Sequence, residues 1–152
     1  FLIMKKKITI LGSTGSIGKS LIKILKKDIN NFNILLLTVD KNIKELLKQI
    51  KTFNVKNIIV TDHKKFIQIK KILRKKQINI YNNFNSLDKI FYNKKNDYIM
   101  NSISGLDGLE PTIKIIKFTK KIAIANKESI ICGWSLIKNE LVRNKTNFTA
   151  SI

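Results

Sequence analysis

Short runs of β-branched and other apolar residues alternate along the chain with longer stretches in which apolar residues recur every three or four positions. The short runs are typical of strands buried on both sides of a parallel sheet, and the periodic stretches are typical of amphipathic helices. The apolar runs predict strands at 8–11, 34–39, 57–60, 78–81, 98–103, 121–125 and 148–150. The periodic stretches predict helices at 17–27, 43–53, 66–73, 86–91 and 111–118, and from Glu128 onward.

Strands and helices alternate without an internal repeat and without a linker rich in serine or proline. This order predicts an α/β fold, a Rossmann-like doubly wound parallel sheet in three α/β/α layers. The length of 152 residues suits one domain with a hydrophobic core, which we expect to span residues 4–152. We assign no role to Phe1–Ile3, which precede Met4.

Composition places the chain among soluble globular proteins, with 43% hydrophobic and 26% charged residues. No apolar run approaches the roughly 20 residues of a membrane span, and the start lacks the features of a signal peptide. We therefore expect a cytoplasmic protein with no membrane partner. Cys132 is the only cysteine, so we expect no disulfide framework and no thiolate metal site. We interpret it as a helix-packing residue rather than a nucleophile.

The net charge of +20 raises the alternative of a non-enzymatic basic domain that binds nucleic acid. The charge comes almost entirely from lysine, whereas base and phosphate recognition usually recruits arginine, here only Arg74 and Arg143. The lysines stand among many isoleucines and asparagines, a composition that an AT-rich genome favours. We therefore do not expect a nucleic-acid partner, and the salt dependence of DNA binding would test that alternative.

Three glycines stand between the first predicted strand and the first predicted helix, in ILGSTGSIG at residues 10–18. Gly12 permits a tight turn, Gly15 lets the backbone approach a pyrophosphate, and Gly18 lets the helix pack closely on the sheet. The amides expected to point at the phosphates are those of Thr14, Gly15, Ser16 and Ile17. The hydroxyl groups that can add hydrogen bonds are those of Ser13, Thr14 and Ser16. The pattern predicts a dinucleotide site, although a Gly/Ser turn without a ligand also fits it.

A loop of the nucleoside-triphosphate type is excluded, because Ser13 occupies a position where that loop requires glycine. After the second predicted strand come Asp40, Lys41 and Asn42. A carboxylate there usually binds the ribose hydroxyls of NAD, whereas lysine and asparagine suit the 2′-phosphate of NADP. The chemistry of these three residues alone does not decide between NAD and NADP. A plain turn with Asn42 as the cap of the next helix is a further alternative.

A second polar cluster, ANKES at residues 125–129, lies where a predicted strand ends and a helix begins. Ligands bind at this edge in open α/β sheets. Asn126 can bond an amide or a hydroxyl, Lys127 can bind an anion, and Glu128 can accept from sugar hydroxyls. The same residues also fit an ordinary capped start of a helix, without a ligand.

ILGSTGSIG, GLDGLEPT at residues 105–112 and ANKES, in this order, resemble the 1-deoxy-D-xylulose 5-phosphate reductoisomerase family over essentially the whole chain. The resemblance implies NADPH as cofactor and 1-deoxy-D-xylulose 5-phosphate as substrate, converted to 2-C-methyl-D-erythritol 4-phosphate in non-mevalonate isoprenoid biosynthesis. It also implies a homodimer for the full-length enzyme. The implied cofactor contacts are Thr14, Gly15, Ser16, Ile17, Asp40, Lys41, Asn42, Asn126 and Glu128, and the implied substrate contact is Lys127.

Two departures from the family pattern change what we expect. Asp40 stands where the family often has a small or neutral residue, and we expect Lys41 to offset its charge. Where the family continues into Pro-Val-Asp-Ser-Glu-His, whose carboxylates bind a divalent metal (Mn or Mg), residues 147–152 are NFTASI. We therefore expect an N-terminal fragment that binds NADPH but holds no metal ligands and no catalytic residues, and does not turn over substrate. A third hypothesis is an inert remnant that does not fold stably.

Overall fold

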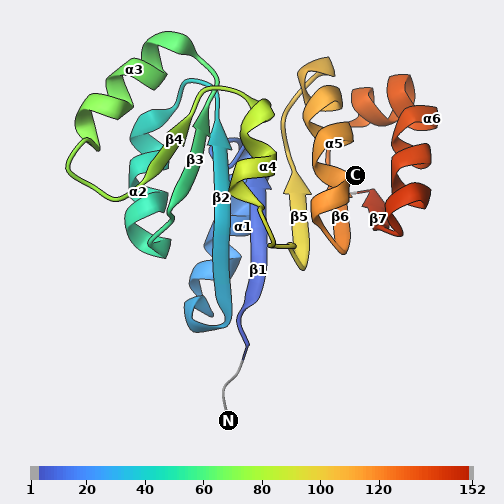
Figure 1. Ribbon diagram of the computed structural model, residues 1–152, viewed down its shortest axis with the longest axis horizontal. Helices are drawn as coiled ribbons and strands as arrows, with labels where there is room; N and C mark the ends of the chain where they lie inside the picture. The colour runs from blue at the N-terminus through green and yellow to red at the C-terminus, as the bar shows by residue number, and fades with distance from the viewer. Residues whose placement is uncertain (1–3, 151–152) are drawn as a thin grey trace.

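A computed structural model describes residues 4–150, so Phe1–Ile3 and the end of the predicted 4–152 domain lie outside the described residues. Strands and helices alternate as predicted (Figure 1). The strands are β1 (Lys6–Leu11), β2 (Phe32–Val39), β3 (Asn57–Val60), β4 (Asn79–Tyr81), β5 (Tyr98–Asn101), β6 (Lys121–Ile124) and β7 (Asn147–Ala150). The α-helices are α1 (Ser16–Lys26), α2 (Ile43–Phe53), α3 (His63–Ile72), α4 (Leu87–Ile90), α5 (Leu109–Ile115) and α6 (Lys127–Asn144). Short 3₁₀ turns lie at Ile29–Asn31, Phe84–Ser86, Leu106–Gly108 and Ile116–Phe118.

The strands form one parallel sheet in the order β4-β3-β2-β1-β5-β6-β7. From β1 the chain moves outward to β4, then returns to the other side of β1 with β5 and moves outward again to β7. The direction therefore switches between β1 and β5. In sheets of this kind, ligands bind in the crevice beyond the carboxyl ends of the strands at that switch.

Helices cover both faces of the sheet and bury two separate apolar clusters, which confirms the predicted three-layer fold (Figure 1). On one face α1, α2 and α3 contribute Leu25, Leu46 and Ile69. On the other face α4, α5 and α6 contribute Ile90, Ile115 and Ile137. None of the helices within residues 4–150 is long and apolar enough to cross a membrane.

Several element boundaries differ from the prediction by up to three residues, and the structure explains two of these differences. The strand predicted at 98–103 ends at Asn101, because its neighbour β1 ends at Leu11 and Gly12 turns away with a φ of 72°. The Ser102 hydroxyl instead donates to the carbonyl oxygens of Leu11 and Gly12, at 2.8 and 2.9 Å. The helix predicted at 111–118 begins earlier, at Leu109, and its last turn tightens into the 3₁₀ turn Ile116–Phe118.

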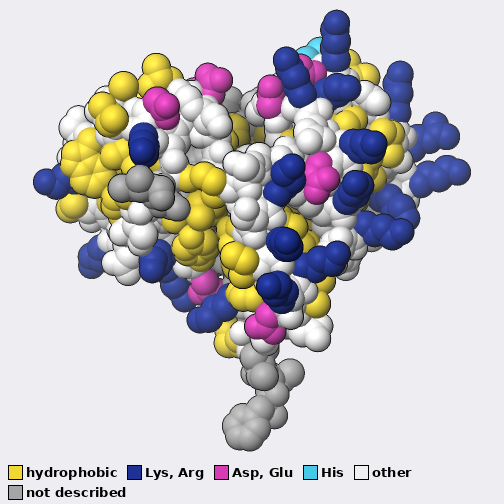
Figure 2. Space-filling view, turned by 180° about the vertical axis from the view of Figure 1, so that it is seen from behind, with side chains coloured by type: hydrophobic (Ala, Val, Ile, Leu, Met, Phe, Trp, Pro, Cys, Tyr) yellow, Lys and Arg dark blue, Asp and Glu magenta, His cyan; other side chains and the backbone are white. Residues whose placement is uncertain are grey.

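The C-terminal helix α6 has apolar side chains on its outer side as well as its inner side. Its inner side buries Ser129, Gly133, Ile137 and Leu141, whereas Ile131, Trp134, Leu136 and Val142 are exposed. Cys132 is also exposed, so its interpretation as a packing residue is wrong. Figure 2 shows hydrophobic side chains gathered on the side of these C-terminal elements, and lysine and arginine side chains on the side of α2 and α3.

Helix α1 lies against the turn that precedes it, and Gly18 makes this close contact possible. A Cβ atom at position 18 would overlap the carbonyl oxygen of Gly12 and lie 2.7 Å from the carbonyl carbon of Ser13. Both obstacles are backbone atoms that cannot rotate away. The sequence-based role of Gly18, close packing of helix on sheet, therefore agrees with the structure.

Replacing Gly18→Ala should lower the free energy of unfolding by about 2 kcal/mol, because overpacking against backbone outweighs the gain of about 1 kcal/mol in helix propensity. Urea denaturation followed by circular dichroism measures the change. The matched control is Gly133→Ala in α6, where a Cβ meets the flexible end of the Leu109 side chain. Equal effects of the two substitutions would contradict the close approach at Gly18.

Asp97 joins the amino ends of three strands. Its Oδ2 accepts a hydrogen bond from the Lys7 backbone N–H at 2.8 Å, and its Oδ1 accepts from Lys120 Nζ at 3.1 Å. The Lys7 amide bond lowers the pKa of Asp97 most, burial opposes it, and the hydrogen bond and charge of Lys120 lower the pKa further. The ionised carboxylate is therefore the form that stabilises this edge of the sheet.

Because the folded-state pKa of Asp97 is depressed, its stabilising effect is present above the unfolded pKa of about 4 and is lost as the pH falls through the folded pKa. Asp97→Asn should therefore lower the free energy of unfolding at pH 7, and the difference from the unsubstituted chain should shrink steadily below pH 4. Urea titrations at a series of pH values measure it. The control Asp88→Asn removes an exposed ion pair with Lys117 and should change stability little. A difference at Asp97 that is independent of pH would refute the linkage.

Candidate functional site

A cavity of about 650 Å³ opens at the carboxyl edge of the sheet, across the switch between β1 and β5. The turn after β1 contributes Gly12, Thr14 and Gly15 to its lining. One side of the cavity is formed by residues that follow β2, β3 and β4, and the other by residues that follow β5 and by α5. The cavity thus stands where the fold predicts a ligand.

The turn after β1 is held by bonds from both neighbouring strands. The Gly12 N–H donates to Thr38 Oγ1 at 3.1 Å, and the Gly12 carbonyl oxygen accepts from the Gly15 N–H at 3.3 Å and from the Ser102 hydroxyl. Gly12 has a positive φ, and a Cβ there would lie 3.1 Å from the backbone of Ser102 and Ile103. Glycine at position 12 is therefore required by the fold itself.

Gly15 differs from Gly12 and Gly18, because nothing in the folded chain requires a glycine at this position. Its φ is −74°, which suits any residue, and a Cβ would touch only the Gly12 carbonyl oxygen at an ordinary 3.7 Å. The residue is exposed and lines the cavity. The space above Gly15 is therefore open to a group that approaches the backbone from outside.

The N-terminus of α1 has no side-chain cap, unlike those of α2, α3 and α6. The capping side chains of those three helices are Asn42, Asp62 and Asn126, which accept from the amides of Glu45, Lys65 and Ser129. At the start of α1, the amides of Ser16 and Ile17 have no acceptor within the helix. Of the four amides that the sequence analysis expects to point at phosphates, those of Ser16 and Ile17 stay available to an anion, whereas the Gly15 amide donates to the Gly12 carbonyl oxygen.

Ser13 and Thr14 differ in whether their hydroxyl groups can serve a ligand. Thr14 lines the cavity, but Ser13 is fully buried and its hydroxyl does not reach the cavity, contrary to expectation. The Ser13 carbonyl accepts from Gln49 Nε2 at 3.0 Å, while Ser13 Oγ and Gln49 Oε1 are buried without a partner. Ser13 therefore belongs to the support of the turn.

Asp40 and Lys41, which follow β2, line two different cavities. Asp40 lines the main cavity, and its Oδ1 accepts from the Thr61 hydroxyl at 2.8 Å. Lys41 and Asn42 line a smaller groove of about 330 Å³ at α2 and α3, to which Lys65 also contributes. The alternative of Asn42 as a helix cap is confirmed, since its Oδ1 accepts from the Glu45 amide at 3.1 Å.

The ANKES residues stand at the start of α6 and do not line the cavity. Lys127 and Glu128 are exposed, whereas Asn126 is buried. The Asn126 amide nitrogen donates to the carbonyl oxygens of Ile103, at 2.7 Å, and Gly105, while its oxygen caps α6. The side chain of Asn126 is thereby fully engaged, and it holds the segment 102–105 that forms one wall of the cavity.

Several cavity residues were not singled out from the sequence. They are Thr38, Val39, Thr61, Asn82–Asn85, Ser102, Ile103 and Lys114, whereas Asp107, Glu110 and Pro111 belong to the GLDGLEPT motif and Ser104 directly precedes it. Many of them follow a strand, so the rule that ligands bind beyond the carboxyl ends of parallel strands could have indicated them. No motif marks Lys114, which lies within α5.

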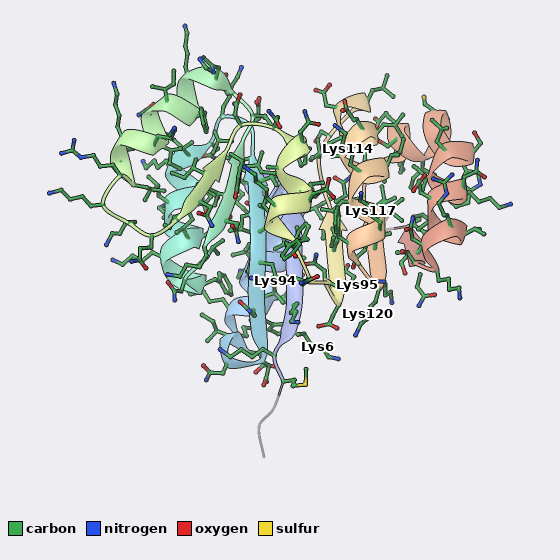
Figure 3. All side chains as sticks on the ribbon, in the orientation of Figure 1. Lys6, Lys94, Lys95, Lys114, Lys117 and Lys120 are labelled. Atoms are coloured by element: carbon green, nitrogen blue, oxygen red, sulfur yellow. The ribbon has the colours of Figure 1, made fainter. Side chains whose placement is uncertain are left out.

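A stripe of lysine side chains runs from α5 to the amino edge of the sheet (Figure 3). It consists of Lys6, Lys94, Lys95, Lys114, Lys117 and Lys120. Ion pairs partly neutralise this stripe: Lys114 pairs with Glu110, Lys117 with Asp88 and Lys120 with Asp97. The alternative of a basic domain that binds nucleic acid is not tested by these ion pairs and stays a prediction.

Within residues 4–150, no three His, Cys, Asp or Glu side chains gather in a way that could hold a metal ion.

A family model described as 1-deoxy-D-xylulose 5-phosphate reductoisomerase matches residues 8–133. Among curated relatives, the reductoisomerase of Pelagibacter ubique is 62% identical over 144 residues, which cover 94% of this chain and 37% of that protein. The reductoisomerase of Clostridium tetani is 33% identical over 150 residues, covering 93% of this chain and 38% of that protein. The chain thus spans less than half the length of these relatives.

Solved structures show the same similarity. The reductoisomerase of Zymomonas mobilis in complex with NADPH superposes with a TM-score of 0.87 at 26% identity, covering 97% of this chain and 38% of that one. A homoserine dehydrogenase of S. aureus matches with a TM-score of 0.56 at 19% identity, which concerns the fold alone.

Asn126→Ala should lower the free energy of unfolding by about 3 kcal/mol, because it removes a helix cap and leaves two carbonyl groups without their donor. Hydrogen exchange should also quicken in residues 102–105. Chemical denaturation and exchange mass spectrometry measure the two effects. Asn139→Ala, an exposed position of the same helix, is the control and should change neither. Unchanged exchange at 102–105 in Asn126→Ala would show that this side chain does not hold the wall.

Proposed function

Since the chain belongs to the 1-deoxy-D-xylulose 5-phosphate reductoisomerase family, we propose that its cavity binds NADPH, with the pyrophosphate over Gly15 and the first turn of α1. The observation that carries this proposal is the combination of an open Gly15 with an uncapped helix facing the same cavity. A pyrophosphate there would accept from the amides that the fold leaves unpaired. Its charge would also interact favourably with the helix dipole.

The arrangement after β2 supports NADPH rather than NADH. Asp40 faces the main cavity, where its carboxylate suits ribose hydroxyls, and it is held by Thr61. Lys41 faces the smaller groove together with Lys44 and Lys65. Among the described residues, no carboxylate forms an ion pair with these three lysines. We propose that the adenosine ribose lies at Asp40 and that the additional 2′-phosphate of NADPH reaches these lysines, whose positive charge favours it.

The wider role follows from the relatives. We propose that this chain is the cofactor-binding part of a protein that converts 1-deoxy-D-xylulose 5-phosphate to 2-C-methyl-D-erythritol 4-phosphate, with NADPH as reductant. Lys127, exposed at the start of α6, stays the proposed contact to the substrate. NADPH supplies the hydride in that reaction, and the residues of this chain bind and orient it. The described residues offer no ready set of metal ligands, so the proposal for this chain concerns the cofactor alone.

Calorimetric titration of the chain with NADPH should show binding, and Gly15→Ala should weaken it at least tenfold. The new methyl group occupies the space that the pyrophosphate needs, while the fold has room for it. The free energy of unfolding of Gly15→Ala should stay within about 1 kcal/mol of the original.

NADH provides the second comparison, because it should bind more weakly than NADPH and should lose affinity in Gly15→Ala by a similar factor. Thermal melting of each variant separates lost binding from lost folding. Absence of binding at millimolar NADPH, with a cooperative melting transition, would refute the proposed function.

A further inference from the structure

Lys114 is the one positively charged side chain that lines the main cavity, among the residues that the structure describes. It lies on α5, closer to the carboxyl edge of the sheet than Lys117 (Figure 3). About one-third of its side chain is exposed. The sequence motifs that point to the cofactor do not include this residue.

The ammonium group of Lys114 is held from both sides of the cavity. Its Nζ donates to Asn85 Oδ1 at 2.8 Å, and Asn85 belongs to the segment that follows β4 on the opposite wall. It also forms an ion pair with Glu110 Oε1 at 2.6 Å, one turn earlier in α5. An ammonium group has three protons, so these two bonds leave one N–H free to donate.

The charges that line the cavity make this group important for an anionic occupant. The other charged lining residues are Asp40, Asp107 and Glu110, all of them carboxylates. Like charges in a partly enclosed space disfavour a pyrophosphate, and only backbone amides and Lys114 oppose them. Without Lys114, the charged side chains of the cavity would all be acidic.

We propose that Lys114 is a binding residue for the phosphate groups of the cofactor, and that Glu110 and Asn85 are the residues that position it. This inference rests on the proposed function, because it takes a dinucleotide as the occupant of the cavity. The charged hydrogen bond from the third N–H strengthens the binding of a phosphate group. The contacts of Lys114 to both walls of the cavity fix where that N–H lies.

Lys117 offers a matched control. It lies one turn after Lys114 and also reaches across to the α4 side, where its Nζ pairs with Asp88 at 3.3 Å. It does not line the cavity. A substitution of Lys117 therefore removes the same charge and a similar cross-link, but leaves the cavity lining unchanged.

In the full 152-residue chain, Lys114→Gln should weaken the binding of NADPH about fivefold, the effect of one partly exposed charged contact. Lys114→Arg should retain most of the affinity, and Lys117→Gln should match the unsubstituted chain. Inorganic pyrophosphate, titrated as a second probe, should show the same order. Raising the salt concentration should shrink the effect of Lys114→Gln, because mobile ions screen the contact.

The outcomes separate the inference from the function on which it rests. Equal NADPH affinities of Lys114→Gln and Lys117→Gln would overturn the inference and leave the proposed function standing. Binding of pyrophosphate but not NADPH, with a loss confined to Lys114→Gln, would refute the proposed function and support the phosphate role of Lys114. A chain that melts cooperatively but binds neither probe would overturn both.

Discussion

The peptide group of Gly12 joins three parts of the fold through its carbonyl oxygen. That oxygen accepts from the Gly15 amide and from the Ser102 hydroxyl, and it occupies the place that any side chain at Gly18 would need. The turn after β1, the end of β5 and the first turn of α1 are therefore fixed relative to one another. Because the cavity opens between β1 and β5, the positions of the open amides above it depend on this one group.

The fold could be predicted from the sequence because its signals are local. Strands buried on both faces leave unbroken apolar runs such as 34–39, and the helices between them keep the period of 3.6 residues. The cap at Asn42 could likewise be foreseen, since its partner Glu45 is three residues away. A boundary cannot be read from local signals where a distant neighbour decides it, as β1 does for the end of β5.

The site could be predicted only in part, because several of its side chains act through partners far along the chain. Asn126 bonds to the carbonyl groups of Ile103 and Gly105, which no periodicity or spacing connects with it. Lys114 meets Asn85 across the cavity, although only its pairing with Glu110 follows from helical spacing. A sequence motif therefore combines residues that can face a ligand with residues that hold the wall.

The uncapped start of α1 also connects folding to the composition of the surrounding solution. A ligand that binds only the folded chain raises its stability by mass action, by about 1.4 kcal/mol for each tenfold of free ligand above its dissociation constant. The caps of α2, α3 and α6 are part of the chain and do not vary with concentration. The anion proposed to complete α1 would come from outside the chain. The melting temperature of this protein would then measure how much of that anion is present.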